Sequence, residues 1–371
     1  MTRRSLRFVG TAAACLLGWA SGARAVDGVI EMNDASILAA GGYPGQIALP
    51  GSYVLTGNLT PPPGKDGIQV FASDVTLDLN GFAIFGSGAN GIVGLGGGLT
   101  VRNGTVGGFS SGVNAGTSSR VYQVRATFNT GTGISGFRCV IVESIAENNG
   151  TGIQADRCKV ENSVVSGSSG PGIVGNQIVI VHNNILSNTG GGILTPGGST
   201  IQENSIQDNG TFGISDGVFG PPPTPPPATP GRLDIRGNVI SNNGGAAGGP
   251  GISLILPALI TENTISGSTG SGIACGSGCV VNGNSINSNN TLGLPGSGGV
   301  ALGAGSNASD NSISFNTGFG INLPITSGYS QNTLNANAGP DMLRSPVPGA
   351  HPTSGFHNLC SGIAGPAPTC P

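Results

Sequence analysis

A Gly followed by Ile or Val recurs along this chain at intervals close to 21 residues. A fixed period in the range of about 20–50 residues is typical of a repeat architecture, in which each unit buries its apolar face only by stacking on its neighbours. A chain with this pattern is therefore expected to fold as a solenoid. The aliphatic members are Ile68, Ile92, Val113, Ile134, Ile153, Ile173, Ile193, Ile214, Ile252, Ile273, Val300 and Ile321.

Two columns of Asn accompany this period. One Asn stands two residues before an aliphatic residue, and a second Asn stands three residues after it. Turn Asn tolerates the left-handed conformation, and stacked Asn side chains bond to one another in ladders. We interpret both columns as structural, and we expect the Gly before each Ile to supply a bend. The columns are Asn162, Asn183, Asn204, Asn238, Asn263, Asn284, Asn311 and Asn332, and then Asn148, Asn188, Asn209, Asn243, Asn289, Asn316 and Asn337.

The apolar segments between these residues are short, β-branched and bounded by Gly, Asn and Ser, which predicts strands. Three short strands per repeat, with all repeats in register, form three parallel sheets around a narrow core. Equivalent residues then stack at about 4.8 Å. The prediction is an all-β parallel β-helix of about twelve coils, with an N-terminal cap and a C-terminal tail that contains Cys.

The repeat resembles the right-handed parallel β-helix of the pectate-lyase-like superfamily, over roughly residues 45–338. The segments 51–60 and 74–82 resemble the opening of secreted bacterial β-helix-repeat proteins. The resemblance implies a scaffold that interacts with a polysaccharide or a surface, with no assignable reaction. A polysaccharide lyase, hydrolase or epimerase is the alternative, and a structural or adhesion protein of the cell envelope is a second one.

The resemblance also implies where a reaction would occur, on the outer face of the Gly-Ile strands. Carboxylates there would hold a cation or act as acid and base. The outward residue after each repeat aliphatic is uncharged in all twelve units, so no catalytic residue, cofactor or metal site is carried over. These residues are Gln69, Val93, Asn114, Ser135, Gln154, Val174, Leu194, Ser215, Ser253, Ala274, Ala301 and Asn322.

Two other groups of residues are candidates for a site. Glu161, His182 and Glu203 each precede a ladder position on successive coils, so they are expected to align as a catalytic group; a solvated polar stripe is the alternative. Arg138 and Arg157 each stand four residues after a repeat Ile, and stacked Arg side chains suit carboxylates or sulfates of a polymer. Pairing of these two Arg with nearby Asp156, Glu143 or Glu147 is the competing interpretation.

Residues 1–25 have the pattern of a cleaved signal peptide: a basic start, a short apolar run and the sequence Ala-Arg-Ala. The predicted organisation is then a cap over 26–66, repeats over 67–338 and a capping tail over 339–371. We expect an exported protein that is periplasmic, secreted or at the cell surface, without a membrane span. Removing the four Arg of the signal leaves 10 Lys and Arg against 17 Asp and Glu, which disfavours nucleic acid as a partner. The sequence leaves the oligomeric state open.

Six Cys remain after the signal, and an export route is oxidising. Cys139 and Cys158 both follow their repeat Ile by five residues, so they are expected on adjacent coils, at a spacing that a disulfide fits. Cys275 with Cys279, and Cys360 with Cys370, are the other expected pairs. Zinc binding by Cys275 and Cys279 is the weaker alternative, since no His lies near them in the sequence.

Overall fold

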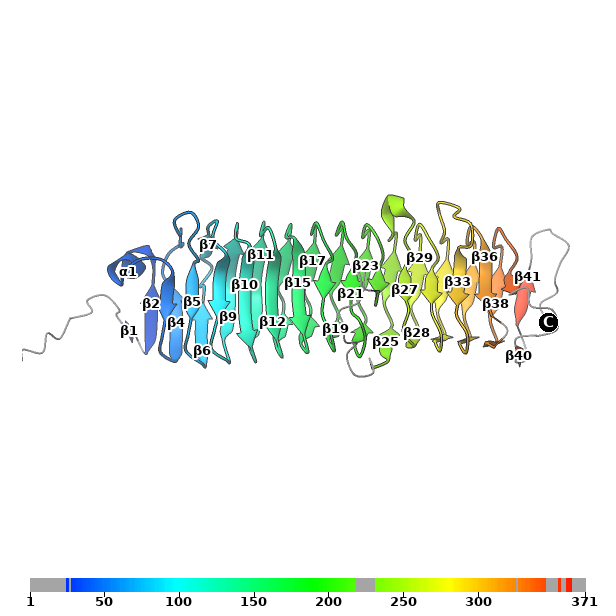
Figure 1. The fold of residues 1–371 in the computed structure, drawn as a ribbon, viewed down its shortest axis with the longest axis horizontal. Helices are drawn as coiled ribbons and strands as arrows, with labels where there is room; N and C mark the ends of the chain where they lie inside the picture. Colours follow the sequence, from blue (N-terminus) through cyan, green and yellow to red (C-terminus); the bar gives the residue numbers. More distant parts are fainter. Residues whose placement is uncertain are drawn as a thin grey trace, which may run out of the picture.

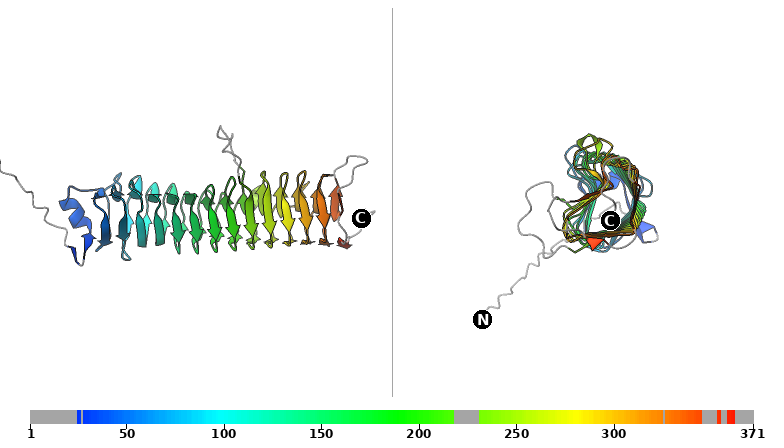
Figure 2. Two further views of the ribbon diagram at one scale, coloured as in Figure 1. Left: turned by 90° about the horizontal axis from the view of Figure 1, so that it is seen from below. Right: turned by 90° about the vertical axis from the view of Figure 1, so that its right-hand side faces the viewer.

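In the computed structural model the chain winds into a long parallel β-helix, with the coils following one another from one end of the rod to the other (Figure 1). The structure describes residues 25–26, 28–217, 231–324, 326–344, 353–354 and 358–361. Successive coils superimpose when they are viewed down the rod (Figure 2), which agrees with the in-register pairing of their strands. The predicted fold class is confirmed.

The first face of the β-helix is the sheet of fourteen parallel strands that carries the Gly-Ile repeat. Its ladder pairs Ile134 with Ile153 and Ile153 with Ile173, and all three side chains are fully buried. The strands are β3 (Gly45–Ile47), β5 (Ile68–Val70), β8 (Asn90–Gly94), β10 (Ser111–Thr117), β12 (Thr132–Phe137), β15 (Thr151–Asp156), β18 (Ile173–Val174), β21 (Ile193–Leu194), β24 (Ile214–Ser215), β27 (Ile252–Leu254), β30 (Ile273–Cys275), β33 (Gly298–Leu302), β36 (Phe319–Leu323) and β39 (Met342–Arg344).

The second face consists of parallel strands that follow the first corner of each coil. β1 (Ala25–Val26) pairs with its first strand in the antiparallel direction. The strands are β2 (Val29–Met32), β4 (Gly51–Leu55), β6 (Val75–Asp78), β9 (Thr100–Gly107), β11 (Arg120–Thr127), β13 (Val140–Val142), β16 (Lys159–Glu161), β19 (Val179–Val181), β22 (Thr200–Gln202), β25 (Leu233–Arg236), β28 (Ala258–Thr261), β31 (Val280–Asn282), β34 (Asn307–Ser309), β37 (Gly328–Ser330) and β40 (Thr353–Ser354).

The third face is reached through a bend of one or two residues, and in most coils the first bend residue has a positive φ, such as 56° at His182. The second and third faces form one continuous sheet because β9 and β11 run across this bend. The remaining strands of the third face are β7 (Ala83–Phe85), β14 (Ile145–Glu147), β17 (Val164–Ser166), β20 (Asn184–Leu186), β23 (Ser205–Gln207), β26 (Val239–Ser241), β29 (Thr264–Ser266), β32 (Ser285–Asn287), β35 (Ser312–Ser314), β38 (Thr333–Asn335) and β41 (Leu359–Ser361). A short 3-10 helix, η1 (Gly245–Ala247), lies between β26 and β27.

The β-helix has about fourteen turns rather than the predicted twelve. The two additional strands of the first face are β3 and β39, one at each end. They lack the repeat dipeptide: Gly45 occupies the position of Ile68, and Met342 occupies the position of Ile321. Terminal repeats are commonly atypical because one of their sides has no neighbouring repeat.

The Gly of the repeat is required by a close approach of two backbones, and not by a bend as predicted. None of the twelve Gly residues has φ in the left-handed region. A Cβ on Gly192 would lie 2.4 Å from the carbonyl oxygen of Gly213 and 2.7 Å from a methyl group of Ile206. The coils can therefore stack at this edge only when the position has no side chain.

The Asn columns form two ladders of hydrogen bonds, as predicted. In one of them, the main-chain N–H and side-chain amide of Asn204 both donate to Oδ1 of Asn238, each at 3.0 Å. Two members of the predicted columns are wrong, however. Asn148 and Asn162 are exposed bend residues with φ near 50°, and the ladder positions on those coils belong to Asn149 and Ser163.

At the N-terminal end, the short helix α1 (Asp34–Ala39) packs Ile37 against the core. Asn33 caps this helix: its side chain accepts the N–H of Ser36, and the Ser36 hydroxyl accepts the N–H of Asn33. The predicted signal lies outside the described residues except for Ala25. No helix among the described residues is long and apolar enough to cross a membrane.

Candidate functional site

The first face is poor in charged side chains along the middle of its strands. The register aligns the twelve outward residues after the repeat aliphatics in one uncharged column, as the sequence predicted. A shallow depression of about 300 Å³ lies over this face, between Ser253 and Ala301. None of the residues that line it is charged. The groups with acid–base or ionic chemistry must be sought at the corners.

The predicted alignment of Glu161, His182 and Glu203 is wrong for Glu161. Glu161 pairs in register with Val181, one position before His182, and forms an ion pair of 2.7 Å with Lys159. The cause is a register shift of one residue. Asn162, and not Glu161, occupies the bend position that His182 and Glu203 occupy on the next two coils. A shift by one residue changes the column to which every side chain of a strand belongs.

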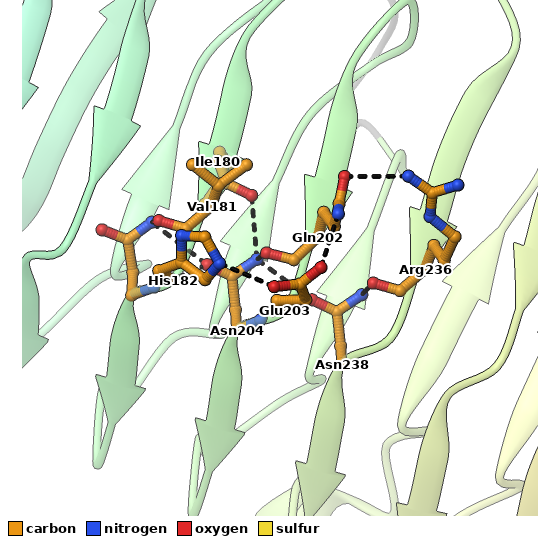
Figure 3. A network of polar contacts seen from close by, with 9 residues as sticks. Ile180, Val181, His182, Gln202, Glu203, Asn204, Arg236 and Asn238 are labelled. Atoms are coloured by element: carbon orange, nitrogen blue, oxygen red, sulfur yellow. Dashed lines mark hydrogen bonds and ion pairs between the residues drawn. The ribbon is translucent and has the colours of Figure 1, made fainter.

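His182 and Glu203 do come together on adjacent coils (Figure 3). Nε2 of His182 lies 2.6 Å from Oε2 of Glu203, and Gln202 donates to the other carboxylate oxygen at 2.6 Å. Arg236 donates to Gln202 at 3.1 Å, which extends the network to a third coil. The hydrogen bonds from Gln202 and His182 hold the pKa of the Glu203 carboxyl below its usual value. Both carboxylate oxygens are engaged by exposed side chains, and surface networks of this kind have little stabilising effect.

Arg138 and Arg157 share one column, as predicted, at the corner between the first and second faces. The neighbouring register pairs Phe137 with Asp156 and Val140 with Lys159. Both Arg residues are exposed, and both guanidinium groups lie over the ring of Phe137, at 5.1 and 5.6 Å from its centroid. Two cations thus flank one half-exposed aromatic ring, a favourable cation–π arrangement.

The competing interpretation, pairing of these Arg with nearby carboxylates, is wrong. Asp156 accepts the main-chain N–H of Asn176 at 2.7 Å. Glu143 accepts from a Gln side chain at 3.0 Å, and Glu147 forms an ion pair with an Arg of the third face. Within the described part of the chain, neither Arg138 nor Arg157 forms an ion pair. Their positive charges are left without a protein counter-ion.

Two further cations complete this surface, which we call the basic corner: Arg120, Arg138, Arg157 and Lys159, with Phe137 between them. Arg120 and Lys159 occupy one column of the second face, two coils apart, with exposed Val140 between them. Arg120 lies over the ring of Tyr122 at 5.3 Å and forms no ion pair among the described residues. The sequence analysis singled out Arg138 and Arg157, and the structure adds Arg120 and Lys159 to the same surface.

A disulfide lies directly behind the basic corner. Cys139 and Cys158 follow Arg138 and Arg157 in the sequence, are almost fully buried, and are bonded, with Cα atoms 4.5 Å apart. Cys275 and Cys279 are also bonded, at the edge of the first face. Two of the three predicted pairs are thus confirmed, and they are consistent with the expected export to an oxidising compartment. Cys370 lies outside the described residues; Cys360 lies in β41, in register with Leu334.

The two disulfides should differ in their effect on stability. Replacing Cys139 and Cys158 together by Ala is expected to lower the free energy of unfolding by about 3 kcal/mol, because this bond closes a loop of 19 residues. The same replacement of Cys275 and Cys279 should cost about 2 kcal/mol, because only 4 residues separate them. Chemical denaturation of the two variants measures the difference. A larger loss for the second pair would contradict the chain-entropy argument.

Comparison with known proteins agrees with the geometry. No protein-family model matches this chain, and neither does any curated protein. The A-module of mannuronan C-5 epimerase AlgE4 from Azotobacter vinelandii matches with a TM-score of 0.54 and 18% identity, over 92% of this chain and 98% of its own. The A-module of AlgE6 from the same organism matches with a TM-score of 0.51 and 15% identity, over 89% and 94%. This likeness shows the fold, and the chain is a parallel β-helix protein.

Proposed function

We propose that this β-helix binds an acidic polysaccharide at the basic corner. The observation that carries the proposal is the pair Arg138 and Arg157: both are exposed, they lie one coil apart, and neither pairs with a carboxylate of the described residues. A guanidinium group offers two parallel N–H donors to a carboxylate or sulfate, and Phe137 offers an apolar surface to a sugar ring. Two solved structures with this fold are named for mannuronan, whose sugar units carry carboxylates.

Replacing both Arg138 and Arg157 by Ala should weaken binding to a polyuronate about 100-fold. Each charge-assisted hydrogen bond contributes about 1.5 kcal/mol or more, and about 1.4 kcal/mol is a factor of ten in affinity. Isothermal titration at fixed ionic strength measures the loss. The affinity of the unaltered protein should also fall as salt is added, because the contacts are ionic.

The matched control is the double replacement of Arg125 and Arg236 by Ala, which removes the same charge elsewhere. Arg125 lies on the third face, and Arg236 lies three coils beyond Lys159. The control should bind with the affinity of the unaltered protein. Both variants should have the same circular dichroism spectrum as the unaltered protein. Equal affinity of the Arg138/Arg157 variant would end the proposal. Release of unsaturated or cleaved sugars during the titration would instead favour the enzymatic alternative.

A further inference from the structure

We infer that the corner between the first and second faces docks on an anionic lipid surface. Three exposed apolar side chains, which we call the apolar strip (Leu49, Phe71 and Leu95), enter the lipid, and the basic corner contacts the headgroups. The inference goes beyond the proposed function, because it adds a partner and depends on residues that the glycan does not require. The evidence is the exposure of the strip, its continuity with unpaired cations, and the convex shape of this edge.

The apolar strip follows the strands β3, β5 and β8 of the first face. Leu49, Phe71 and Leu95 are 68%, 47% and 59% exposed. The main-chain N–H of Phe71 donates to the carbonyl oxygen of Ile47 at 2.8 Å. That of Leu95 donates to Val70 at the same distance, so Leu95 and Phe71 are directly opposed on adjacent coils. Large apolar side chains that are exposed side by side mark an interaction surface.

The strip protrudes because the corner is two residues longer on the coils of Phe71 and Leu95 than at the basic corner. Six positions separate Ile68 from the bend residue Asp74, whereas four separate Ile134 from the bend residue Arg138. The core has the same cross-section on both coils, so the added positions lie outside it. The side chains of the strip are thus carried away from the core by the length of the corner.

The apolar strip and the basic corner lie on one edge of the rod. The bend residues of five successive coils all have positive φ and form one column, joined by main-chain hydrogen bonds of 2.9–3.1 Å. The column consists of Asp74, Gly98, Ser118, Arg138 and Arg157. Its first two members belong to coils of the strip, and its last two belong to the basic corner. Because coils repeat at about 4.8 Å, the strip ends about 10 Å before Arg138 along the axis.

A lipid surface fits this edge better than a second protein does. The edge is convex, because two flat faces meet there, and a rigid partner would need a matching groove. A bilayer yields to protruding apolar side chains, while cationic side chains stay at the level of the headgroups. The guanidinium groups of Arg138 and Arg157, which form no ion pair among the described residues, complement lipid phosphates. An apolar anchor and a basic patch together give stable association, where either alone is marginal.

Co-sedimentation of the full chain with vesicles tests this surface. Replacing both Phe71 and Leu95 by Ser should lower the affinity for vesicles of equal parts phosphatidylglycerol and phosphatidylcholine about 100-fold. Each large apolar side chain that enters the lipid contributes about tenfold or more. Replacing Arg138 and Arg157 by Ala should lower this affinity about 25-fold and leave that for pure phosphatidylcholine unchanged, because each cation contributes about fivefold at an anionic surface. Residues 1–25 are common to all variants, so their contribution cancels in these ratios.

The matched control for the strip is the double replacement of Phe128 and Phe315 by Ser. It removes two apolar side chains, 63% and 62% exposed, from the bends after the third face, and it should not change vesicle binding. The Phe71/Leu95 variant should keep its polyuronate affinity, so the inference and the proposed function fail separately. Equal vesicle affinity of the two double variants would overturn the inference. A dimer that only the Phe71/Leu95 variant loses, without vesicle binding, would overturn it in favour of a second copy of this chain.

A single carboxylate gives a readout of the opposite sign. Asp74 is exposed at the bend three residues after Phe71, where its charge opposes contact with an anionic surface. Asp74→Asn should raise the affinity for the anionic vesicles about fivefold. Asn tolerates the φ of 56° at this bend, so the fold is retained. Asp208→Asn, at an exposed bend after the third face, is the matched control and should have no effect. Equal affinity of the two Asn variants would contradict docking by this edge.

Discussion

Replacing Asn204 by Ala is expected to lower the free energy of unfolding by about 4 kcal/mol. Asn204 is buried in the middle of a ladder. Its Oδ1 accepts two hydrogen bonds from Asn183, and its side-chain amide donates to Asn238 and to the carbonyl oxygen of Ile180. Alanine leaves these buried groups without partners, at a cost of about 1–3 kcal/mol for each unsatisfied group. The effects are not additive, which limits the total.

Chemical denaturation, with hydrogen exchange to localise the loss, measures this effect. The matched control is Asn184→Ala, since Asn184 lies on the neighbouring coil, directly after the ladder residue Asn183, but is exposed on the third face. The control should change stability by no more than about 0.5 kcal/mol. Exchange should become faster first in β19, β20, β22 and β23, because a solenoid is stabilised by nearest-neighbour contacts. Equal stability of the two variants would show that the ladder does not stabilise the fold.

Gly192→Ala should be nearly as damaging, with an expected loss of about 3 kcal/mol. The new Cβ would meet the carbonyl oxygen of Gly213, a backbone atom that no rotamer change can move away. Relief requires the two coils to separate, which weakens the ladder bond that Ile193 donates to Gly213 at 2.9 Å. Overpacking of a rigid interior typically costs about 1–3 kcal/mol, and this contact is at the severe end.

The control for this substitution is Gly57→Ala. Gly57 also lacks a left-handed φ, and a Cβ there would meet only Asn33, at an ordinary 3.9 Å. Its stability should be unchanged or slightly raised, because Ala restricts the unfolded chain more than Gly does. Thermal unfolding of the two variants compares them directly. A Gly192 variant as stable as the Gly57 variant would refute the close-approach explanation of the repeat.

The rigidity of this stack matters for the basic corner. Arg138 and Arg157 are held one coil apart by the same ladder of main-chain bonds, in which the main-chain N–H of Arg138 donates to the carbonyl oxygen of Asp156 at 2.9 Å. Both residues have φ near 50°, the left-handed conformation, because the chain turns the corner there. The scaffold thus fixes the spacing of the charges before any ligand binds, which lowers the cost of binding.

The errors of sequence reasoning concentrate on two coils. Val164 and Val165 are both apolar, so alternation does not say which one points inward; Val165 is fully buried and Val164 is exposed. Taking Val164 as the inward residue places Asn162 in the ladder and Glu161 in the column of His182, and both placements are wrong. Only the position of the bend decides between the two registers. On this coil the ladder position is occupied by Ser163, so the Asn that marks this position on most other coils is missing from the sequence pattern.

The sequence by itself determined the solenoid, the residues of its core, and the two cross-linked pairs of Cys, because these depend on a period that is local and repeats. The tertiary structure decided the identity of the site. Which cations of the basic corner remain unpaired depends on where Asp156, Glu143 and Glu147 find their partners, and those partners lie about 20 residues away. Ionic pairing between coils is set by distances across the stack, and a difference of one residue in coil length is enough to change it.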